Sequence, residues 1–188
     1  MVFYVSSYNE FQKEMSNFSK IVKGKYVQRL EYIFVSVDGN KMTLTGTNGY
    51  TAYERVMEID NPNDVKVEFT IPIETAKVFK RVKGDARLQI ELQDNITLFS
   101  YDNQTITCIN DKDVFKRYAT TISQILHKEH KNEHRLKIDA KLLIDILRSF
   151  DKPYIVIDLD SNTEPIRVEE NEFGQKKAIV LPIRFSDE

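Results

Sequence analysis

The sequence predicts an α+β fold in which antiparallel sheets carry helices on one face. One supersecondary unit, a strand followed by a helix and then by further strands, recurs along the 188 residues as a weak internal repeat. Short turns rich in Asp, Asn and Gly separate neighbouring strands, which favours antiparallel hairpins. Each helical segment has one apolar stripe, which is expected to face a sheet.

The first copy of the unit starts with a short apolar strand at residues 1–6. Ser7 and Glu10 form a capping box, because the hydroxyl and the carboxylate can each satisfy a backbone donor. The helix after them is expected to stop at Gly24, and its apolar residues at helical spacing are Phe11, Met15, Phe18 and Val22. Strands are then expected at residues 30–37, 41–47 and 53–59, with turns at 38–40 and 48–49.

A loop at residues 61–64 leads into the second copy. A strand is expected at 65–71, followed by Pro72 and a shorter helix at 74–82 that turns Phe79 and Val82 inward and ends at Gly84. Three further strands are expected at residues 87–93, 96–101 and 105–109, separated by tight turns at 94–95 and 102–103.

The third copy follows a segment of different character at residues 111–134. Its part 127–134 (HKEHKNEH) is almost wholly polar and is typical of a solvated linker or helix end. A strand at 136–138 and the N-cap Asp139 then precede a helix closed by Pro153, with the apolar face Leu143, Ile146, Leu147 and Phe150. The last strands are expected at residues 154–159, 166–169 and 177–185.

The composition excludes several classes of protein. No run approaches the roughly 20 apolar residues of a membrane helix, and the N-terminus lacks the pattern of a signal peptide. Cys108 is the sole cysteine, so no internal disulfide can form, which fits a reducing cytosol. The net charge is −2, so any contact with nucleic acid needs a local concentration of Lys and Arg.

The outer faces of all three helices are basic. The residues opposite or beside the apolar stripes are Lys13, Lys20, Lys77, Lys80, Arg81, Lys83, Lys141, Arg148 and Lys152, with Asp145 among them. Exposed helix faces commonly carry Lys, so a solvated surface is one interpretation. The other is an electrostatic surface that contacts the DNA phosphate backbone without reading bases.

The sequence gives no positive case for an enzyme or for a cofactor. It contains no phosphate-binding glycine loop, dinucleotide fingerprint, paired-His zinc motif or nucleophile elbow. His127, His130 and His134 have helix-like spacing that could hold a metal, but a solvated polar segment explains them more simply. Cys108 lies in an alternating strand and is expected to be a buried structural thiol.

Four segments resemble one family in the same order along the chain. Residues 46–52 (GTNGYTA) are similar to the Ala-Thr-Asp-Gly-(His/Tyr)-Arg-Leu turn of the bacterial DNA polymerase III beta subunit, the sliding clamp. Ile71-Pro72 opens the second helix as in that family, and Asn110-Asp111 with Phe115 and Tyr118 resembles its connection between domains. Residues 181–185 (LPIRF) resemble its terminal Met-Pro-(Met/Val/Ile)-Arg-Leu.

The resemblance implies a DNA clamp (processivity-factor) fold and a division into domains. Residues 1–112 resemble the family's complete middle domain, and 135–188 resemble the second half of its C-terminal domain, with 113–134 as a linker. The family's first domain has no counterpart in the chain. Thr51 and Ala52 replace the Arg and Leu of the family's turn, and Lys116 replaces the Pro of its connection.

The resemblance also implies a groove that receives short peptides from polymerases and clamp loaders. Carried over position by position, its walls are Leu30, Thr47, Gly49, Tyr50, Ala52, Pro72, Ala76, Leu142, Thr163, Pro165, Ile179, Leu181, Pro182, Ile183 and Arg184. Apolar anchors would fill the groove while Arg184 and backbone groups fix the orientation of the peptide. Several of these residues could equally belong to an ordinary core.

The implied function is that of a non-enzymatic sliding clamp, which tethers replication proteins to double-stranded DNA. The resemblance also implies a homo-oligomeric ring. Two alternatives remain open: an adaptor or decoy that binds clamp-interaction peptides without encircling DNA, and an unrelated α+β enzyme. A bacterial cytoplasmic location is implied, and the shortening favours a phage or mobile element as the source.

Overall fold

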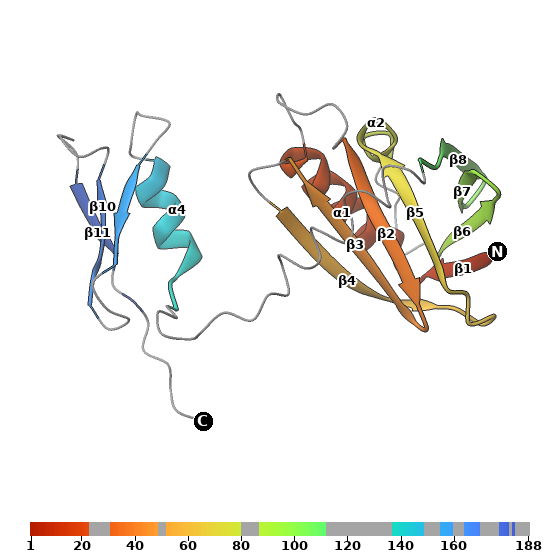
Figure 1. Cartoon of the computed structure of the whole chain (residues 1–188), viewed down its shortest axis with the longest axis horizontal. Helices are drawn as coiled ribbons and strands as arrows, with labels where there is room; N and C mark the ends of the chain where they lie inside the picture. The colour runs from red at the N-terminus through yellow and green to blue at the C-terminus, as the bar shows by residue number, and fades with distance from the viewer. Residues whose placement is uncertain are drawn as a thin grey trace. The chain divides into compact units, whose positions relative to one another are not determined.

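The computed structural model describes residues 1–22, 31–48, 52–79, 87–111, 137–148, 155–159, 164–169, 177–180 and 182. The chain divides into two compact units, unit 1 (Met1–Lys128) and unit 2 (Glu129–Glu188) (Figure 1). Unit 1 combines antiparallel strands with two helices on one face of its sheet, and the described part of unit 2 combines them with one helix, so the predicted α+β class is confirmed. No helix in the described part of the chain is long and apolar enough to cross a membrane.

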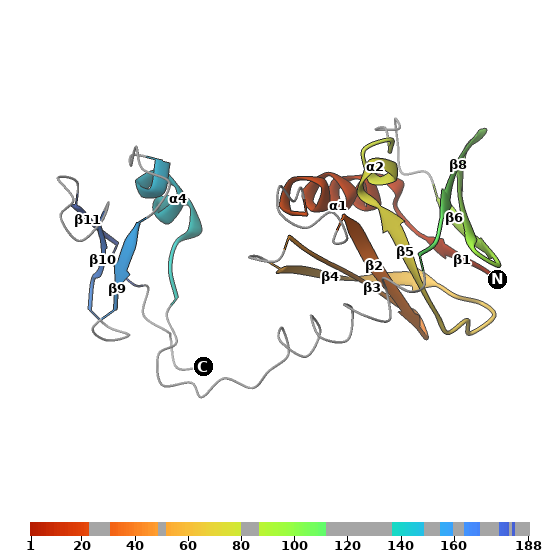
Figure 2. The same cartoon turned by 45° about the horizontal axis from the view of Figure 1, so that its top comes forward.

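Unit 1 is built on an eight-stranded sheet with the order β5-β2-β3-β4-β1-β6-β7-β8. The strands are β1 (Val2–Val5), β2 (Tyr32–Asp38), β3 (Lys41–Thr47), β4 (Ala52–Asp60), β5 (Val67–Pro72), β6 (Leu88–Gln93), β7 (Ile96–Tyr101) and β8 (Gln104–Ile109). Helices α1 (Tyr8–Ile21) and α2 (Ile73–Ala76) lie beside each other on one face of this sheet (Figure 2). The element order is therefore β-α-β-β-β twice over, which confirms the predicted repeat in this unit.

The two repeats of unit 1 exchange their first strands. β1 of the first repeat pairs with β6 of the second, and β5 of the second repeat pairs with β2 of the first. β1 also pairs with β4 at its other edge. At the corresponding junction between β5 and β8, the Asp111 amide donates to Thr70 Oγ1 at 2.8 Å. The two four-stranded halves of the sheet, β5-β2-β3-β4 and β1-β6-β7-β8, are thus joined at both junctions.

Local sequence signals explain where these elements start and turn. Ser7 caps α1, and its Oγ accepts a hydrogen bond from the Glu10 amide at 3.2 Å. Gly39, Asp94 and Asp102 have φ between 47° and 55° in the two-residue hairpin turns, a conformation that Gly and Asp tolerate well. The side chain of Asn61 is buried in the loop after β4 and binds the carbonyls of Gly39 and Val65, both at 2.8 Å.

An aromatic cluster fills the space between the helices and the sheet. Phe79, which follows α2, places its ring 5.2 Å from those of Phe11 on α1 and Phe99 on β7. The Tyr8 ring lies 4.0 Å from that of Tyr101. These residues are buried and belong to one continuous core, so the predicted inward faces of α1 and of the segment after α2 are confirmed for them.

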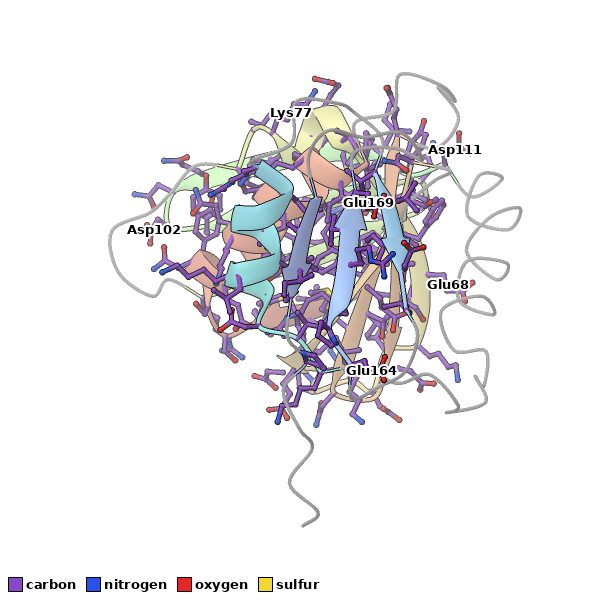
Figure 3. All side chains as sticks on the ribbon, turned by 90° about the vertical axis from the view of Figure 1, so that its left-hand side faces the viewer. Glu68, Lys77, Asp102, Asp111, Glu164 and Glu169 are labelled. Carbon is purple, nitrogen blue, oxygen red and sulfur yellow. The ribbon has the colours of Figure 1, made fainter. Side chains whose placement is uncertain are left out.

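The described part of unit 2 holds one helix and three strands. α4 (Ala140–Arg148) packs on a sheet of order β11-β10-β9, formed by β9 (Val156–Asp158), β10 (Ile166–Glu169) and β11 (Lys177–Val180). Asp139 caps the helix as predicted, since its Oδ1 accepts from the amides of Lys141 at 2.8 Å and Leu142 at 3.2 Å. Figure 3 shows Glu164 before the start of β10 and Glu169 at its end. The buried residues are Ile166, Val168 and Val180, with Leu143 and Leu147 of α4 packed against them.

The structure corrects two of the predicted elements. α2 ends at Ala76 instead of continuing to residue 82, because the chain tightens into a turn in which the Val78 amide bonds to the Thr75 carbonyl at 3.0 Å and Phe79 enters the core. Residues 137–138 of the predicted strand 136–138 are in neither a strand nor a helix. Gly24, Gly84, Pro153 and the polar segment 127–134 with its three histidines lie outside the described residues.

The close packing of α1 on β3 gives a first prediction. A Cβ added at Gly46 would lie 2.6 Å from Val22 Cγ2 and 2.8 Å from Phe18 Cδ1. Gly46→Ala is therefore expected to lower the free energy of unfolding by about 1–3 kcal/mol. Gly39→Asn is the control, because nothing lies within 4 Å of its Cβ position and Asn tolerates a φ of 55°. Denaturant unfolding of both variants is the measurement, and an equal cost at the two positions would contradict this account of α1 packing.

Candidate nucleic-acid and peptide surfaces

The solvent-facing side of α1 carries two lysines. Phe11, Met15 and Phe18 turn inward, and Lys13 and Lys20 are exposed on the opposite side of the helix. Neither lysine forms an ion pair with any other residue in the described part of the chain. Both ammonium groups are therefore available to an anion in solution.

The carboxylates of α1 lie on a different side, toward β4. Arg55 of β4 binds Glu10 Oε1 at 2.6 Å through Nη2, and its Nε lies 3.9 Å from Glu14 Oε1. Glu14 is buried, and its Oε2 accepts hydrogen bonds from the Tyr53 hydroxyl at 2.9 Å and from Asn17 Nδ2 at 3.3 Å. The negative charge of α1 is thus matched by a cation of the sheet, whereas its lysines are not matched.

The predicted basic face of the second helix is smaller than expected. Lys77 is exposed just after α2, and its ammonium forms an ion pair with Glu74 one turn earlier. Such an exposed pair contributes little to stability, but it lowers the positive charge that α2 presents. Lys80 and Arg81 lie outside the described residues.

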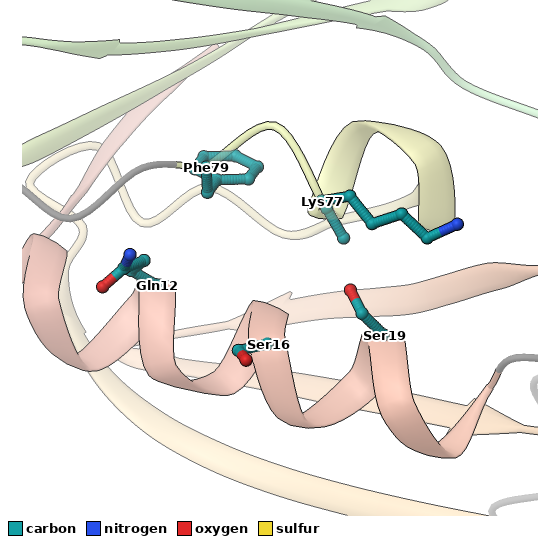
Figure 4. Close-up of a pocket in the computed structure, with 6 residues that line it drawn as sticks. Gln12, Ser16, Ser19, Lys77 and Phe79 are labelled. Carbon is teal, nitrogen blue, oxygen red and sulfur yellow. The ribbon is translucent and has the colours of Figure 1, made fainter.

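A cavity of about 270 Å³ lies between the two helices of unit 1. Figure 4 shows Gln12, Ser16 and Ser19 of α1 on one side and Lys77 and Phe79 on the other. Ala76 completes the lining. The lining is mostly polar, and Ser19 Oγ already donates to the Met15 carbonyl at 2.7 Å. This cavity lies on the same face of unit 1 as Lys13 and Lys20.

In unit 2, α4 repeats the arrangement of α1. Leu143 and Leu147 turn toward the sheet, and Lys141 and Arg148 are exposed. Two of the basic residues predicted on the outer side of this helix are therefore exposed, and so are Leu142 and Ile144. Lys152 lies outside the described residues.

The groove residues of unit 1 that the structure describes gather at one end of the sheet. Thr47 ends β3 and is paired with Ala52, which starts β4. Pro72 ends β5 and is paired with Tyr32 at the start of β2. Thr47 is buried, Pro72 half-buried and Ala52 exposed, and Ala76 belongs to the main core. Leu30, Gly49 and Tyr50 lie outside the described residues.

The groove residues of unit 2 that the structure describes do not gather on one surface. Ala178 and Val180 face α4, so Ile179 between them points to the opposite side of the sheet and is 61% exposed. Leu142 is 56% exposed on α4. Pro165 is exposed before β10, and Pro182 is half-buried. Thr163, Leu181, Ile183 and Arg184 lie outside the described residues, so the groove itself stays a prediction.

The thiol of Cys108 is in the environment of a buried structural residue. Cys108 is buried in β8, and burial raises the pKa of its thiol to about 11, so the thiolate is scarce at neutral pH. No group of three or more His, Cys, Asp or Glu residues with metal-binding geometry occurs in the described ranges.

Solved structures match the chain over nearly its whole length. A protein of Eubacterium rectale, provisionally described as a DNA polymerase III beta subunit, superposes with a TM-score of 0.78 at 15% identity, covering 97% of this chain and 50% of that one. The Bacillus subtilis DNA polymerase sliding clamp superposes with a TM-score of 0.75 at 14% identity, covering 97% of this chain and 49% of that one. The Borrelia burgdorferi DNA polymerase III subunit beta superposes with a TM-score of 0.70 at 17% identity, covering 96% of this chain and 47% of that one.

These superpositions establish the fold. The chain has the sliding-clamp fold that its sequence landmarks predict, and it spans about half the length of the structures it matches. Neither a protein-family model nor a curated protein sequence matches it.

Two features of this face were missed by reasoning from sequence. Gln12, Ser16 and Ser19 recur at helical spacing, which is the signal that could have marked one polar side of α1. The pairing of Glu10 and Glu14 with Arg55 joins residues about 40 positions apart, and no local pattern indicates it.

The contact between Tyr53 and Glu14 gives a prediction with a defined pH dependence. Burial, and next the hydrogen bond with Glu14, raise the pKa of Tyr53 above its usual value of about 10. The neutral phenol donates to the carboxylate, so its stabilising contribution is fully present below the unfolded-state pKa and is lost as the pH rises through the folded-state pKa.

Tyr53→Phe is therefore expected to lower the free energy of unfolding by about 1 kcal/mol at neutral pH. The difference from the parent protein should shrink above pH ~10. Tyr4→Phe is the control at neutral pH, because it keeps an aromatic ring under the Arg87 guanidinium, 4.0 Å from the ring centroid. Urea unfolding at several pH values checks this, and a difference that grows with pH would be contrary to the assigned hydrogen bond.

Proposed function

We propose that this protein is a non-enzymatic, clamp-like tether that holds replication proteins on double-stranded DNA. The observation that carries the proposal is the sliding-clamp fold over 97% of the chain. Because the chain spans about half of the matched structures, ring formation, DNA binding and peptide binding are each proposals for this chain.

The charges of α1 support a DNA-facing role for the helix side of unit 1. Lys13 and Lys20 are exposed and unmatched in the described part of the chain, while Glu10 and Glu14 are matched by Arg55 on β4. A protein with a net charge of −2 therefore keeps a local positive surface on this helix. Gln12, Ser16 and Ser19 add neutral hydrogen-bonding groups beside it.

Contacts of this kind are made to phosphate groups and do not distinguish one base from another. Binding is therefore expected to be weak, insensitive to sequence and steeply dependent on salt, because each neutralised phosphate releases counterions. Lys141 and Arg148, exposed on α4, extend the same character to unit 2.

Reversing the two lysines of α1 tests the DNA-facing assignment. Lys13→Glu with Lys20→Glu is expected to weaken binding to a short duplex of arbitrary sequence. The slope of log K against log salt concentration should also fall by about two, one for each phosphate contact that is lost. The measurement is fluorescence anisotropy over a salt titration. Lys41→Glu with Lys66→Glu is the matched control, since it makes the same change in net charge at exposed positions on β3 and just before β5. Equal losses in both double variants would show that bulk charge, and not this helix face, governs binding.

Peptide binding is proposed at the end of the sheet where Thr47, Ala52 and Pro72 gather. At this end of the sheet Ala52 of β4 is exposed and paired with the buried Thr47 of β3, and the half-buried Pro72 ends β5, with β2 and β3 between β4 and β5. A small exposed residue at this end leaves room for an apolar peptide anchor. The resemblance implies a peptide with a Gln and a Leu-Phe pair.

Blocking this sheet end is the test of peptide binding. Ala52→Arg is expected to reduce the affinity of a peptide with Gln and Leu-Phe by at least about tenfold, because a large charged side chain would occupy the site of an apolar anchor. Val56→Arg, also at an exposed position of β4, is the control. Isothermal titration calorimetry measures both, and peptide affinity that survives Ala52→Arg would remove this sheet end from the proposed groove.

A second candidate function is a clamp-like adaptor that binds such peptides without encircling DNA. The gathering of Thr47, Ala52 and Pro72 at one sheet end within unit 1 supports it, because a peptide site built there needs no closed ring. The two tests separate the candidates. An adaptor should lose function with Ala52→Arg and be indifferent to the reversals at Lys13 and Lys20.

A further inference from the structure

Unit 2 presents, among its described residues, a single repeat of the kind that unit 1 contains twice. α4 followed by β9, β10 and β11 corresponds to α1 with β2, β3 and β4, and equally to α2 with β6, β7 and β8. In unit 1 each repeat is covered by the other, because the first strands are exchanged and the helices lie together. The described residues of unit 2 contain no such second repeat.

The edge of β9 shows the consequence. Its counterparts β2 and β6 are each paired on both sides, with β5 and β1 respectively supplying the outer partner. β9 pairs with β10, and no other described strand pairs with it. The inward-facing Ile33 and Val35 of β2 are fully buried, whereas Ile157, which is paired with the buried Val168, is 47% exposed.

The segment before α4 shows the same deficit. In unit 1, β1 and β5 precede their helices and pair with the opposite repeat. Residues 137–138 occupy the corresponding place before Asp139, and Ile138 packs against the core of unit 2. They are in neither strand nor helix, although the sequence predicts a strand there. In unit 1, both strands at this place pair with a strand of the opposite repeat.

The helix supplies a third observation. Counting from the N-caps Ser7, Pro72 and Asp139 places Ile144 at the position of Gln12 in α1 and of Lys77 after α2. Both of these residues line the cavity between the two helices of unit 1. Ile144 therefore lies on the side of α4 that in unit 1 faces the neighbouring helix, and this isoleucine is 46% exposed.

We propose that unit 2 pairs with unit 2 of a second copy of this chain across a twofold axis, so that two single repeats form one complete domain. The occupant is a second copy because unit 1 shows that repeats of this kind are complementary to each other. Across a twofold axis the same surface of each copy forms the interface, so every contact occurs twice. The proposal rests on the fold and not on DNA or peptide binding.

The pairing makes defined contacts. Residues 137–138 of each copy would lie along β9 of the other, as β5 lies along β2. The two α4 helices would lie side by side with Ile144 of each near the axis, and Ile157 would be covered. An apolar residue where unit 1 has Gln12 and Lys77 suits an interface that forms between chains, since it favours burial.

The mass of the full-length protein in solution is the first test. Sedimentation equilibrium over a concentration series is expected to show a species of twice the 22.0 kDa chain. Ile144→Glu and Ile157→Glu should each weaken this dimer by at least about tenfold. Val56→Glu is the matched control, because Val56 in unit 1 is 48% exposed and lies on β4. Circular dichroism of each variant confirms that it is folded.

Site-specific crosslinking is the second test and keeps the proposal falsifiable if a glutamate variant fails to fold. The sole native thiol, Cys108, is buried, so Ile144→Cys adds one accessible thiol per chain. A short bis-maleimide should join Ile144→Cys copies into a covalent dimer and leave the Val56→Cys control monomeric. A protein that is monomeric at every concentration and is not crosslinked would overturn the proposal, and would indicate that another part of the same chain covers unit 2. A dimer that is unaffected by both glutamate variants would overturn it as well.

Discussion

The exchange of first strands between two repeats is the constraint on which unit 1 depends. β1 pairs with β6 of the second repeat, and β5 pairs along six residues with β2 of the first. Neither repeat can complete its own sheet, because the outer edge of its second strand is filled from the other. Pairings this distant in sequence form late and together, since loop closure must precede the contacts that offset it. The repeats therefore stabilise each other as one domain.

The strand exchange also determines where the helices lie. Because each helix directly follows an exchanged strand, α1 and α2 are brought to the same face of the sheet. Phe11 and Phe79 meet there, with Phe99 of β7 beneath them, and burial of each ring contributes roughly 1.5–3 kcal/mol. The helices touch through this buried layer, while their polar residues leave a cavity above it. The surface proposed to face DNA is thus a product of the core below it.

Local structure followed from the sequence, whereas long-range pairing did not. Ser7 and Asp139 predicted the helix starts because a cap acts within three residues, and Asp94 and Asp102 predicted hairpins because the turn is equally local. The length of α2 was overestimated, because the burial of Phe79 ends the helix and burial is a tertiary effect. The exposure of Lys13 and Lys20 followed from helical periodicity. The opposite orientations of Leu142 and Ile179 did not, since they depend on how α4 packs on its sheet.

On α1, the charged residue that stabilises the fold differs from the charged residues that are proposed to bind DNA. Glu14 is buried and bound to Tyr53 and Asn17, so a change there disturbs the packing of α1 against β4. Lys13 and Lys20 form no hydrogen bond or ion pair within the described ranges, so the fold places no demand on their charge. Residues of this second kind can be exchanged at little cost in stability, so substitutions of these two lysines can test binding without disturbing the fold. The partner proposed for them is the phosphate backbone of DNA, because its charge does not depend on base sequence and two lysines on one exposed helix face can contact it without reading bases.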